Sequence, residues 1–192
     1  MSQQKPPELR NAISLLDSAF TSLGLRYAIV GGTAVVLRGY DRATVDIDAV
    51  VLGADEHIGE IMDTFAQSGI TSRVAEPISF AKRSRMILAR TSAGAGIDVA
   101  LGILPFEYEL VEHADEMALT DELTVPVATA EDLMIMKLIA SRDRDLDDIQ
   151  RLLEIHPQVD KARIRRVVTE FAELLESEEV LENLARLFPK NG

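Results

Sequence analysis

The stretch Val30–Val51, "VGGTAVVLRGYDRATVDIDAVV", carries the pattern that decides the fold. An apolar segment ends at Gly31-Gly32, and a second apolar segment contains Asp46 and Asp48 with one residue between them. Short apolar runs bounded by turn residues are typical of buried strands. Because residues i and i+2 of a strand point to the same face, the two carboxylates are expected to project together while Ile47 points into the core.

The pattern on both sides of this stretch predicts an α/β (α+β) protein with a mixed sheet. Apolar residues recur at helical spacing near the N-terminus, and shorter apolar runs alternate with turn signals after it. The expected elements are a helix over 9–23, strands over 25–30 and 46–52, a helix within 54–69, strands between 70 and 104, and a hairpin over 117–128.

From residue 129 onward the apolar spacing is helical. Thr129 with Asp132 three positions later is a capping-box pattern for the first helix. The expected helices are 130–142, 145–153, 164–175 and 180–187. We therefore predict two parts, an α/β core over residues 1–128 and a helical C-terminal portion over residues 129–192 that packs on the core.

Composition and charge narrow the functional classes. The chain has 192 residues, no cysteine and a formal net charge of −12. The lack of cysteine excludes disulfides and cysteine-bound zinc, and it is consistent with a cytoplasmic protein. No run approaches the ~20 apolar residues that span a bilayer, so no membrane partner is expected. An acidic protein repels nucleic acid, so RNA is a disfavoured partner.

The carboxylates predict a cation site. Asp46 and Asp48 repel each other unless a positive charge lies between them, and oxygen-only ligands suit Mg²⁺ or Mn²⁺. Asp98 in "GIDVAL" is a third carboxylate inside an apolar strand. If that strand pairs beside the first, the three form a cluster of the kind used in two-metal displacement at phosphorus. The alternative is a set of solvated aspartates at a sheet edge.

Four further positions are candidates for binding phosphate. Gly31 and Gly32 allow close approach of the backbone at the start of a helix, and Thr33 adds a hydroxyl donor. The alternative for all three is a plain tight turn. Arg42 lies just before the aspartate pair, where it either reaches a phosphate or lies on the surface.

Lys137 is the single charge in "LMIMKLIA". A lysine in so apolar a helix either extends its stem to solvent or has an anionic partner. Asp145 and Asp148 follow in "RDRDLDDI", where they form either a solvated, ion-paired helix end or part of the site.

The motifs together resemble the DNA polymerase β-like nucleotidyltransferase superfamily. The shared pattern is Gly-Gly, thirteen residues (Thr33 to Val45), Asp-hydrophobic-Asp, and a later hydrophobic-Asp-hydrophobic. The segments "RATVDIDAVV" and "AEDLMIMKLIASRDRDLDDIQRLL" are similar to the AbiEii-type abortive-infection and toxin branch.

The resemblance implies a nucleotidyltransferase-like fold and an enzyme that moves a nucleoside monophosphate from an NTP to an acceptor hydroxyl. The acceptor is a tRNA, a protein or a small molecule, and a toxin role with an antitoxin partner is implied as well. The implied roles are metal binding by Asp46, Asp48 and Asp98, base catalysis by Asp98, and contact with the nucleotide by Gly31, Gly32, Thr33 and Lys137. The competing hypothesis is a non-catalytic nucleotide-binding or interaction module.

Overall fold

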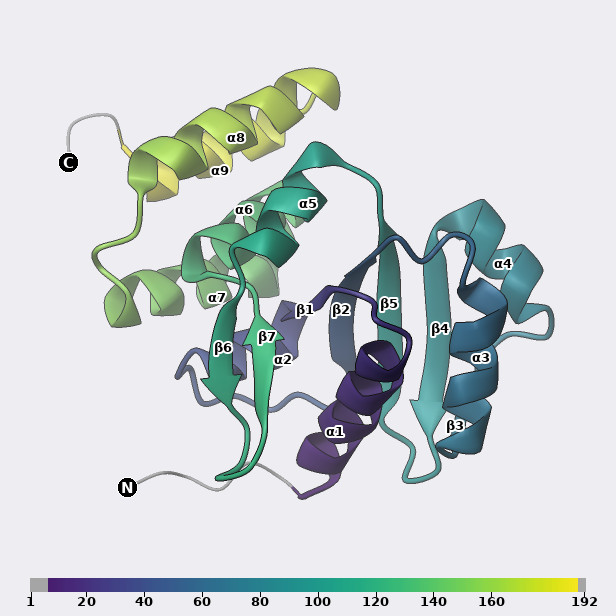
Figure 1. The fold of residues 1–192 in the computed structure, drawn as a ribbon. Coiled ribbons are helices and arrows are strands. Elements are labelled where there is room, and N and C mark those ends of the chain that lie inside the picture. Colours follow the sequence, from purple (N-terminus) through teal and green to yellow (C-terminus); the bar gives the residue numbers. More distant parts are fainter. Residues whose placement is uncertain (1–6, 190–192) are drawn as a thin grey trace. The chain divides into compact units, whose positions relative to one another are not determined.

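The computed structural model describes residues 7–189, and in this part of the chain it contains nine helices and one seven-stranded mixed sheet (Figure 1). The predicted α/β class is confirmed. The helices are α1 (Pro7–Ser22), α2 (Gly31–Leu37), α3 (Ile58–Gln67), α4 (Pro77–Ser84), α5 (Pro105–Glu112), α6 (Ala130–Ala140), α7 (Asp143–Ile155), α8 (Lys161–Leu174) and α9 (Glu178–Leu187). The strands are β1 (Tyr27–Val30), β2 (Ile47–Leu52), β3 (Ile70–Ser72), β4 (Met86–Thr91), β5 (Gly96–Gly102), β6 (Asp115–Ala118) and β7 (Thr124–Val127).

The chain divides into two compact units. The first contains the described residues up to Ala34 together with Ala43–Ala128, and it holds the whole sheet. The second contains Val35–Arg42 and the described residues from Thr129 onward, and it is helical. Helix α2 therefore starts in the first unit and ends in the second.

The strand order of the sheet is β3-β4-β5-β2-β1-β7-β6. The pairs β2–β5 and β1–β7 are parallel, and the other neighbours are antiparallel. The strands at the centre are the most apolar, and all four residues of β1 are buried. This burial fits the position of β1 between β2 and β7, since an interior strand of a sheet has a hydrogen-bonded neighbour along each edge.

One face of the sheet is covered by α1 and α3. Tyr27 pairs with Val51, so both side chains lie on the same face. Phe20 of α1 contacts the ring of Tyr27 at a centroid distance of 5.1 Å, and Phe65 of α3 contacts Phe20 at 6.1 Å. Ile47, on this same face, is fully buried. The carboxylates of β2 therefore lie on the opposite face.

That opposite face is covered at one end only. At the C-terminal end of β5, the side chains of Val50, Leu52 and Glu107 of α5 surround the position where a Cβ of Gly102 would lie. At the near end Asp48 and Asp98 are only half-buried. The sheet is thus open at the end where the aspartates lie.

The helical unit is organised around α6, which packs against α7, α8 and α9. Its N-terminus is capped as predicted, because the Thr129 hydroxyl accepts from the backbone N–H of Asp132 at 3.1 Å. Leu133, Met134 and Ile135 are almost completely buried on successive sides of the helix. An α-helix that is apolar nearly all round is a core helix, and α6 has that position in its unit.

The sequence-based assignment was wrong between residues 70 and 104, where only strands were expected. Helix α4 lies there between β3 and β4. It buries only Ala81, so it has no apolar stripe by which to recognise it. Pro77 at its first turn and Arg85 in a left-handed conformation at its end are its local signals.

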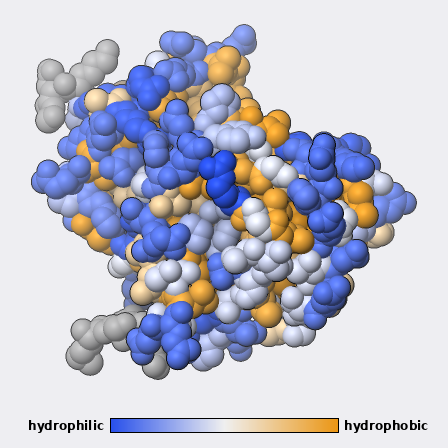
Figure 2. Space-filling view, in the orientation of Figure 1, coloured by the Kyte–Doolittle hydropathy of each residue, from blue (hydrophilic) through white to orange (hydrophobic). Residues whose placement is uncertain are grey.

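None of the described helices is long and apolar enough to cross a membrane. Hydrophilic residues make up much of the face shown in Figure 2, with hydrophobic residues between them. Near the aspartates, the side chain of Val45 stands 72% exposed, directly before Asp46.

Candidate active site

Three predicted carboxylates lie on the open face of the sheet because of the register between two parallel strands. Asp48 of β2 pairs directly with Asp98 of β5. Asp46 lies two residues before Asp48, and Ile47 between them pairs with Ile97 inside the core. Paired residues share a face, and residues two apart share a face, so the fold brings all three carboxylates to one side.

Two glycines make room for these carboxylates. Gly31 follows Val30, the partner of Asp48 across β1 and β2, and has a φ of +63°. A side chain at Gly31 would overlap the Asp48 carboxylate and lie 2.7 Å from its Cβ. A side chain at Gly96 would overlap the Asp46 carboxylate and lie 3.1 Å from its Cγ. Each aspartate therefore lies against backbone that carries no Cβ.

The Thr33 hydroxyl has a partner within the protein. It donates to the backbone carbonyl of Asp46 at 2.7 Å, and the Thr33 side chain is completely buried. This bond ties the first turn of α2 to the residue that enters β2. Gly32, which directly precedes it, is half-buried.

Arg73 is a site residue that sequence reasoning missed. Its guanidinium forms an ion pair with the Asp98 carboxylate. Its backbone N–H donates to the carbonyl of Leu88 at 2.9 Å, directly after the end of β3. Leu88 pairs with Asp98, so the Arg73 side chain crosses one strand to reach its partner. An arginine at the end of a three-residue strand has no sequence pattern that would have identified it.

The electrostatic environment of Asp98 is mixed. Burial is the largest influence and raises the pKa of its carboxyl, and the negative charge of Asp46 raises it further. The Arg73 guanidinium acts in the opposite direction, and the net result is a pKa above the usual range. A carboxylate with a raised pKa is better matched to accepting a proton near neutral pH.

The donor set fits a hard divalent cation, because all three groups are carboxylates and the face is half open to solvent. Among residues 7–189, no group of three or more His, Cys, Asp or Glu side chains is gathered closely enough to hold a metal by itself. Arg73 neutralises Asp98 in this arrangement. A cation bound by Asp46 and Asp48, with water and phosphate completing its shell, is compatible with these residues.

Lys137 and Arg42 belong to the helical unit, where both contact Asp148. The Lys137 ammonium lies 2.6 Å from Asp148 and 3.1 Å from Asp145. Arg42 lies 3.2 Å from Asp148, with its side chain 25% exposed. Lys137 is only 6% exposed, so the interpretation in which its stem extends to solvent was wrong.

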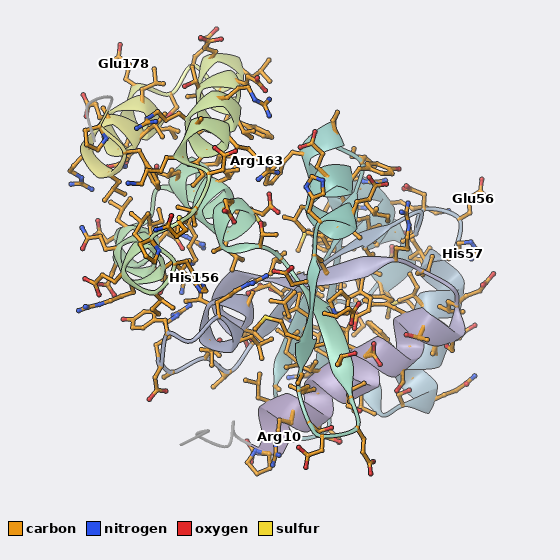
Figure 3. All side chains as sticks on the ribbon, turned by 60° about the vertical axis from the view of Figure 1, so that its left-hand side comes forward. Arg10, Glu56, His57, His156, Arg163 and Glu178 are labelled. Carbon is orange, nitrogen blue, oxygen red and sulfur yellow. The ribbon has the colours of Figure 1, made fainter. Side chains whose placement is uncertain are left out.

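The two aspartates around Lys137 are buried, not a solvated helix end. Asp145 is 1% and Asp148 2% exposed. Burial pushes the pKa of Asp145 upward, but hydrogen bonds from Arg142 and Lys137 outweigh it, and the net pKa is lowered. A further buried pair in this unit joins Asp132 to Arg163, the residue labelled on α8 in Figure 3, at 2.7 Å.

The histidines take no part in the carboxylate row. His57, before the start of α3, lies 3.1 Å from Glu60, and Figure 3 shows it beside Glu56. His156, at the end of α7, contacts the backbone carbonyl of Arg38 at 3.0 Å. The first contact lies within the start of α3, and the second joins the end of α7 to the chain just after α2.

The fold is that of nucleotidyltransferases. The antibiotic-resistance factor ANT(2″)-Ia has a similar structure, with 16% identity, a TM-score of 0.63, and coverage of 91% of this chain and 96% of that one. The lincosamide antibiotic adenylyltransferase LnuA, solved with lincomycin bound, aligns with 17% identity, a TM-score of 0.56, and coverage of 76% and 96%. A nucleotidyltransferase-like protein from Paracoccidioides brasiliensis aligns with 19% identity, a TM-score of 0.55, and coverage of 94% and 96%.

The chain belongs to the family described as "nucleotidyltransferase of unknown function (DUF6036)", whose model matches residues 8–186. Among curated protein sequences, none matches the chain significantly.

Proposed function

We propose that this protein is a metal-dependent nucleotidyltransferase, in which the α/β core of residues 1–128 carries the catalytic carboxylates. The observation that carries the proposal is the register of β2 and β5, which sets Asp48 beside Asp98 with Asp46 on the same open face. Clustered carboxylates repel each other, so their presence on a half-open face favours a site that binds cations over a passive interaction module.

In the proposed reaction, an acceptor hydroxyl oxygen bonds to the α-phosphorus of an NTP. The bond from that phosphorus to the oxygen bridging the α- and β-phosphates breaks, and pyrophosphate leaves. Asp98 takes the hydroxyl proton, a role that suits the raised pKa of its carboxyl. When bound, Mg²⁺ or Mn²⁺ would be held by Asp46 and Asp48 and, where Arg73 gives up its ion pair, by Asp98, and it would neutralise the charge that develops on the phosphates.

The glycine turn and Thr33 hold this geometry. Gly31 leaves room for the Asp48 carboxylate because it has no side chain, and in the proposal the backbone N–H groups of the Gly31-Gly32 turn approach the phosphates. The Thr33 hydroxyl fixes the backbone of Asp46, so its role in the proposal is to position that carboxylate. Lys137 and Arg42, the other predicted nucleotide contacts, are both ion-paired with Asp148 within the helical unit.

A small molecule bearing a hydroxyl is the acceptor that the proposal favours. The formal net charge of −12 disfavours tRNA, whose phosphates meet an acidic protein. The same charge attracts a cationic small molecule. ANT(2″)-Ia has been solved with adenylyl-2″-tobramycin and LnuA with lincomycin, both antibiotics, and acceptors of that size suit this proposal.

The test is incorporation of an α-phosphate label from each of the four NTPs into a panel of acceptors: an aminoglycoside, a lincosamide, bulk tRNA and a protein mixture. Label transfer and pyrophosphate release should require Mg²⁺ or Mn²⁺. Asp48→Asn should abolish both, whereas Asp63→Asn, the same change on the exposed surface of α3, should leave them intact. Metal-independent transfer, or full activity in Asp48→Asn, would contradict the proposal.

The AbiEii-type resemblance extends the proposal to a toxin role with an antitoxin partner. In that case, expression of the parent chain in a bacterial host should arrest growth, and Asp48→Asn should not. Normal growth with the active parent would separate the toxin role from the transferase activity and retain only the latter.

A further inference from the structure

Arg73 completes a row of side chains that crosses four strands. Its backbone lies opposite Leu88 of β4, Leu88 pairs with Asp98 of β5, and Asp98 pairs with Asp48 of β2. Paired residues share a face of the sheet, so Arg73 approaches the carboxylates from the β3 side. Its guanidinium contacts Asp98 directly.

The setting of this ion pair differs from that of an ordinary surface pair. The pair Arg26–Glu112 in the same unit has side chains 63% and 54% exposed. The side chains of Arg73 and Asp98 are 34% and 33% exposed, and Asp98 also faces the like charge of Asp46. A guanidinium beside clustered carboxylates therefore relieves a repulsion that the surface pair does not have.

A divalent cation and the Arg73 guanidinium would compete for the same oxygens. Both are positive, and the Arg73 guanidinium is already ion-paired with the Asp98 carboxylate. The backbone of Arg73 is fixed by its hydrogen bond to Leu88, but the long side chain can turn away without moving the strand. A free guanidinium fork matches the geometry of a phosphate.

We infer that Arg73 is the internal counter-ion of this site and a positioning residue for the nucleotide. In the metal-free protein it neutralises Asp98. On metal binding it leaves Asp98 and contacts a phosphate of the incoming nucleotide. This inference rests on the proposed function, and it assigns to Arg73 a role toward both substrate and metal.

The first experiment measures Mn²⁺ binding to the nucleotide-free protein by calorimetry and by the electron paramagnetic resonance signal of free Mn²⁺. Arg73→Gln should bind Mn²⁺ about three- to tenfold more tightly than the parent, because a competing positive charge is gone. Arg26→Gln removes the same charge from the surface pair and controls for the change in net charge, so it should bind as the parent does.

A double-mutant cycle then tests whether the effect passes through Asp98. In Asp98→Asn the carboxylate that holds Arg73 is neutral, so adding Arg73→Gln should change Mn²⁺ affinity by less than about twofold. At saturating metal, the KM for the NTP should rise in Arg73→Gln and recover partly in Arg73→Lys, which restores charge without the fork.

The outcomes separate the inference from the proposed function. Equal or weaker Mn²⁺ binding by Arg73→Gln, in a parent that binds Mn²⁺ and transfers nucleotide, would overturn the inference alone. A parent that neither binds Mn²⁺ nor transfers nucleotide would overturn the proposed function and this inference with it. An unchanged KM for the NTP in Arg73→Gln would overturn the role toward phosphate.

Discussion

The aspartates of the two units differ in how deeply they are buried and in how many cationic side chains contact them. In the sheet unit, Asp46, Asp48 and Asp98 share an open face, and Arg73 is paired with one of them. In the helical unit, Asp145 and Asp148 are almost completely buried. There each carboxylate is in contact with two cationic side chains, drawn from Lys137, Arg42 and Arg142.

The pKa directions follow this difference. The pKa of Asp98 is raised, chiefly by burial, because a single arginine does not offset burial and a like charge. The pKa of Asp145 is lowered, although it is the more deeply buried, because two cations donate hydrogen bonds to it. Charge pairing, and not depth alone, decides which carboxylates are stabilised as anions. The comparison predicts that removal of a charge lowers stability among the paired residues of the helical unit and raises it among the carboxylates of the sheet unit.

The largest effect is expected from Lys137→Ala. This change leaves Asp145 and Asp148 buried with only arginine partners, and removal of one member of a buried ion pair costs about 3–5 kcal/mol of unfolding free energy. Urea unfolding measures it. Lys82→Ala, on the exposed face of α4, is the control and should cost less than about 0.5 kcal/mol. A loss below about 1 kcal/mol for Lys137→Ala would mean that the pairing contributes little to stability.

The next effect is expected from Gly31→Ala. A side chain at φ +63° is strained and would collide with the Cβ of Asp48, which cannot turn away. The expected loss is about 2 kcal/mol of stability, together with displacement of the carboxylate. At Gly96 φ is not positive, and the new methyl group collides with the Asp46 carboxylate, which can turn, while the Asp46 Cβ lies at an ordinary contact distance of 3.6 Å. Gly96→Ala should therefore keep most of its stability and still weaken Mn²⁺ binding. Equal stability losses in the two variants would contradict this distinction.

Asp145→Asn tests the pairing through its pH dependence. The folded pKa of Asp145 lies below its usual value of 3.8, so its ionised form contributes stability above that pH. That contribution disappears as the pH falls through the lowered folded pKa. At pH 7 the variant should lose about 1–2 kcal/mol of unfolding free energy, since hydrogen bonds to charged groups are replaced by weaker ones. The gap between parent and variant should narrow as the pH is brought below 3.8 in denaturant titrations. A gap that stays constant with pH would argue against an ionic contribution.

The smallest effect, of opposite sign, is expected from Asp48→Asn without added metal. Removal of one of three like charges should raise the unfolding free energy by about 0.5 kcal/mol, or the melting temperature by about 1–2 °C. Differential scanning fluorimetry in the presence of a chelator measures it. The advantage should vanish when Mn²⁺ is added, because only the parent gains from binding. A clear loss of stability would contradict the expectation that repulsion between like charges dominates at this position.

Much of the sheet could be predicted because its strands are apolar and bounded by turn residues. The aspartates were recognisable for the same reason, since a charge within an apolar strand is an anomaly that local preference does not explain. The partners of these charges were not predictable. Arg73 reaches Asp98 through the pairing of β3, β4 and β5, and no local pattern encodes that pairing.

The helical unit shows the same limit from another side. The composition of α6 predicted a buried helix and posed the question of how Lys137 is accommodated. The answer depends on α7, whose Asp145 and Asp148 lie one turn apart and face the lysine. Helix α4 went unrecognised because it contributes one buried residue and therefore has almost no apolar period.

The parallel pairing of β2 with β5 also determines the order in which the carboxylate row can assemble during folding. Parallel neighbours need a crossover, and here the crossover contains α3, β3, α4 and β4. Closing so long a segment costs chain entropy, so contacts between β2 and β5 are expected to form later than contacts of short sequence separation, such as those between the antiparallel neighbours β4 and β5. We therefore expect Asp48 and Asp98 to come together late in folding, when the apolar pairs beside them, such as Ile47 with Ile97, form. On this expectation, the repulsion between the carboxylates acts only when β2 and β5 pair, and it does not slow the earlier steps of folding.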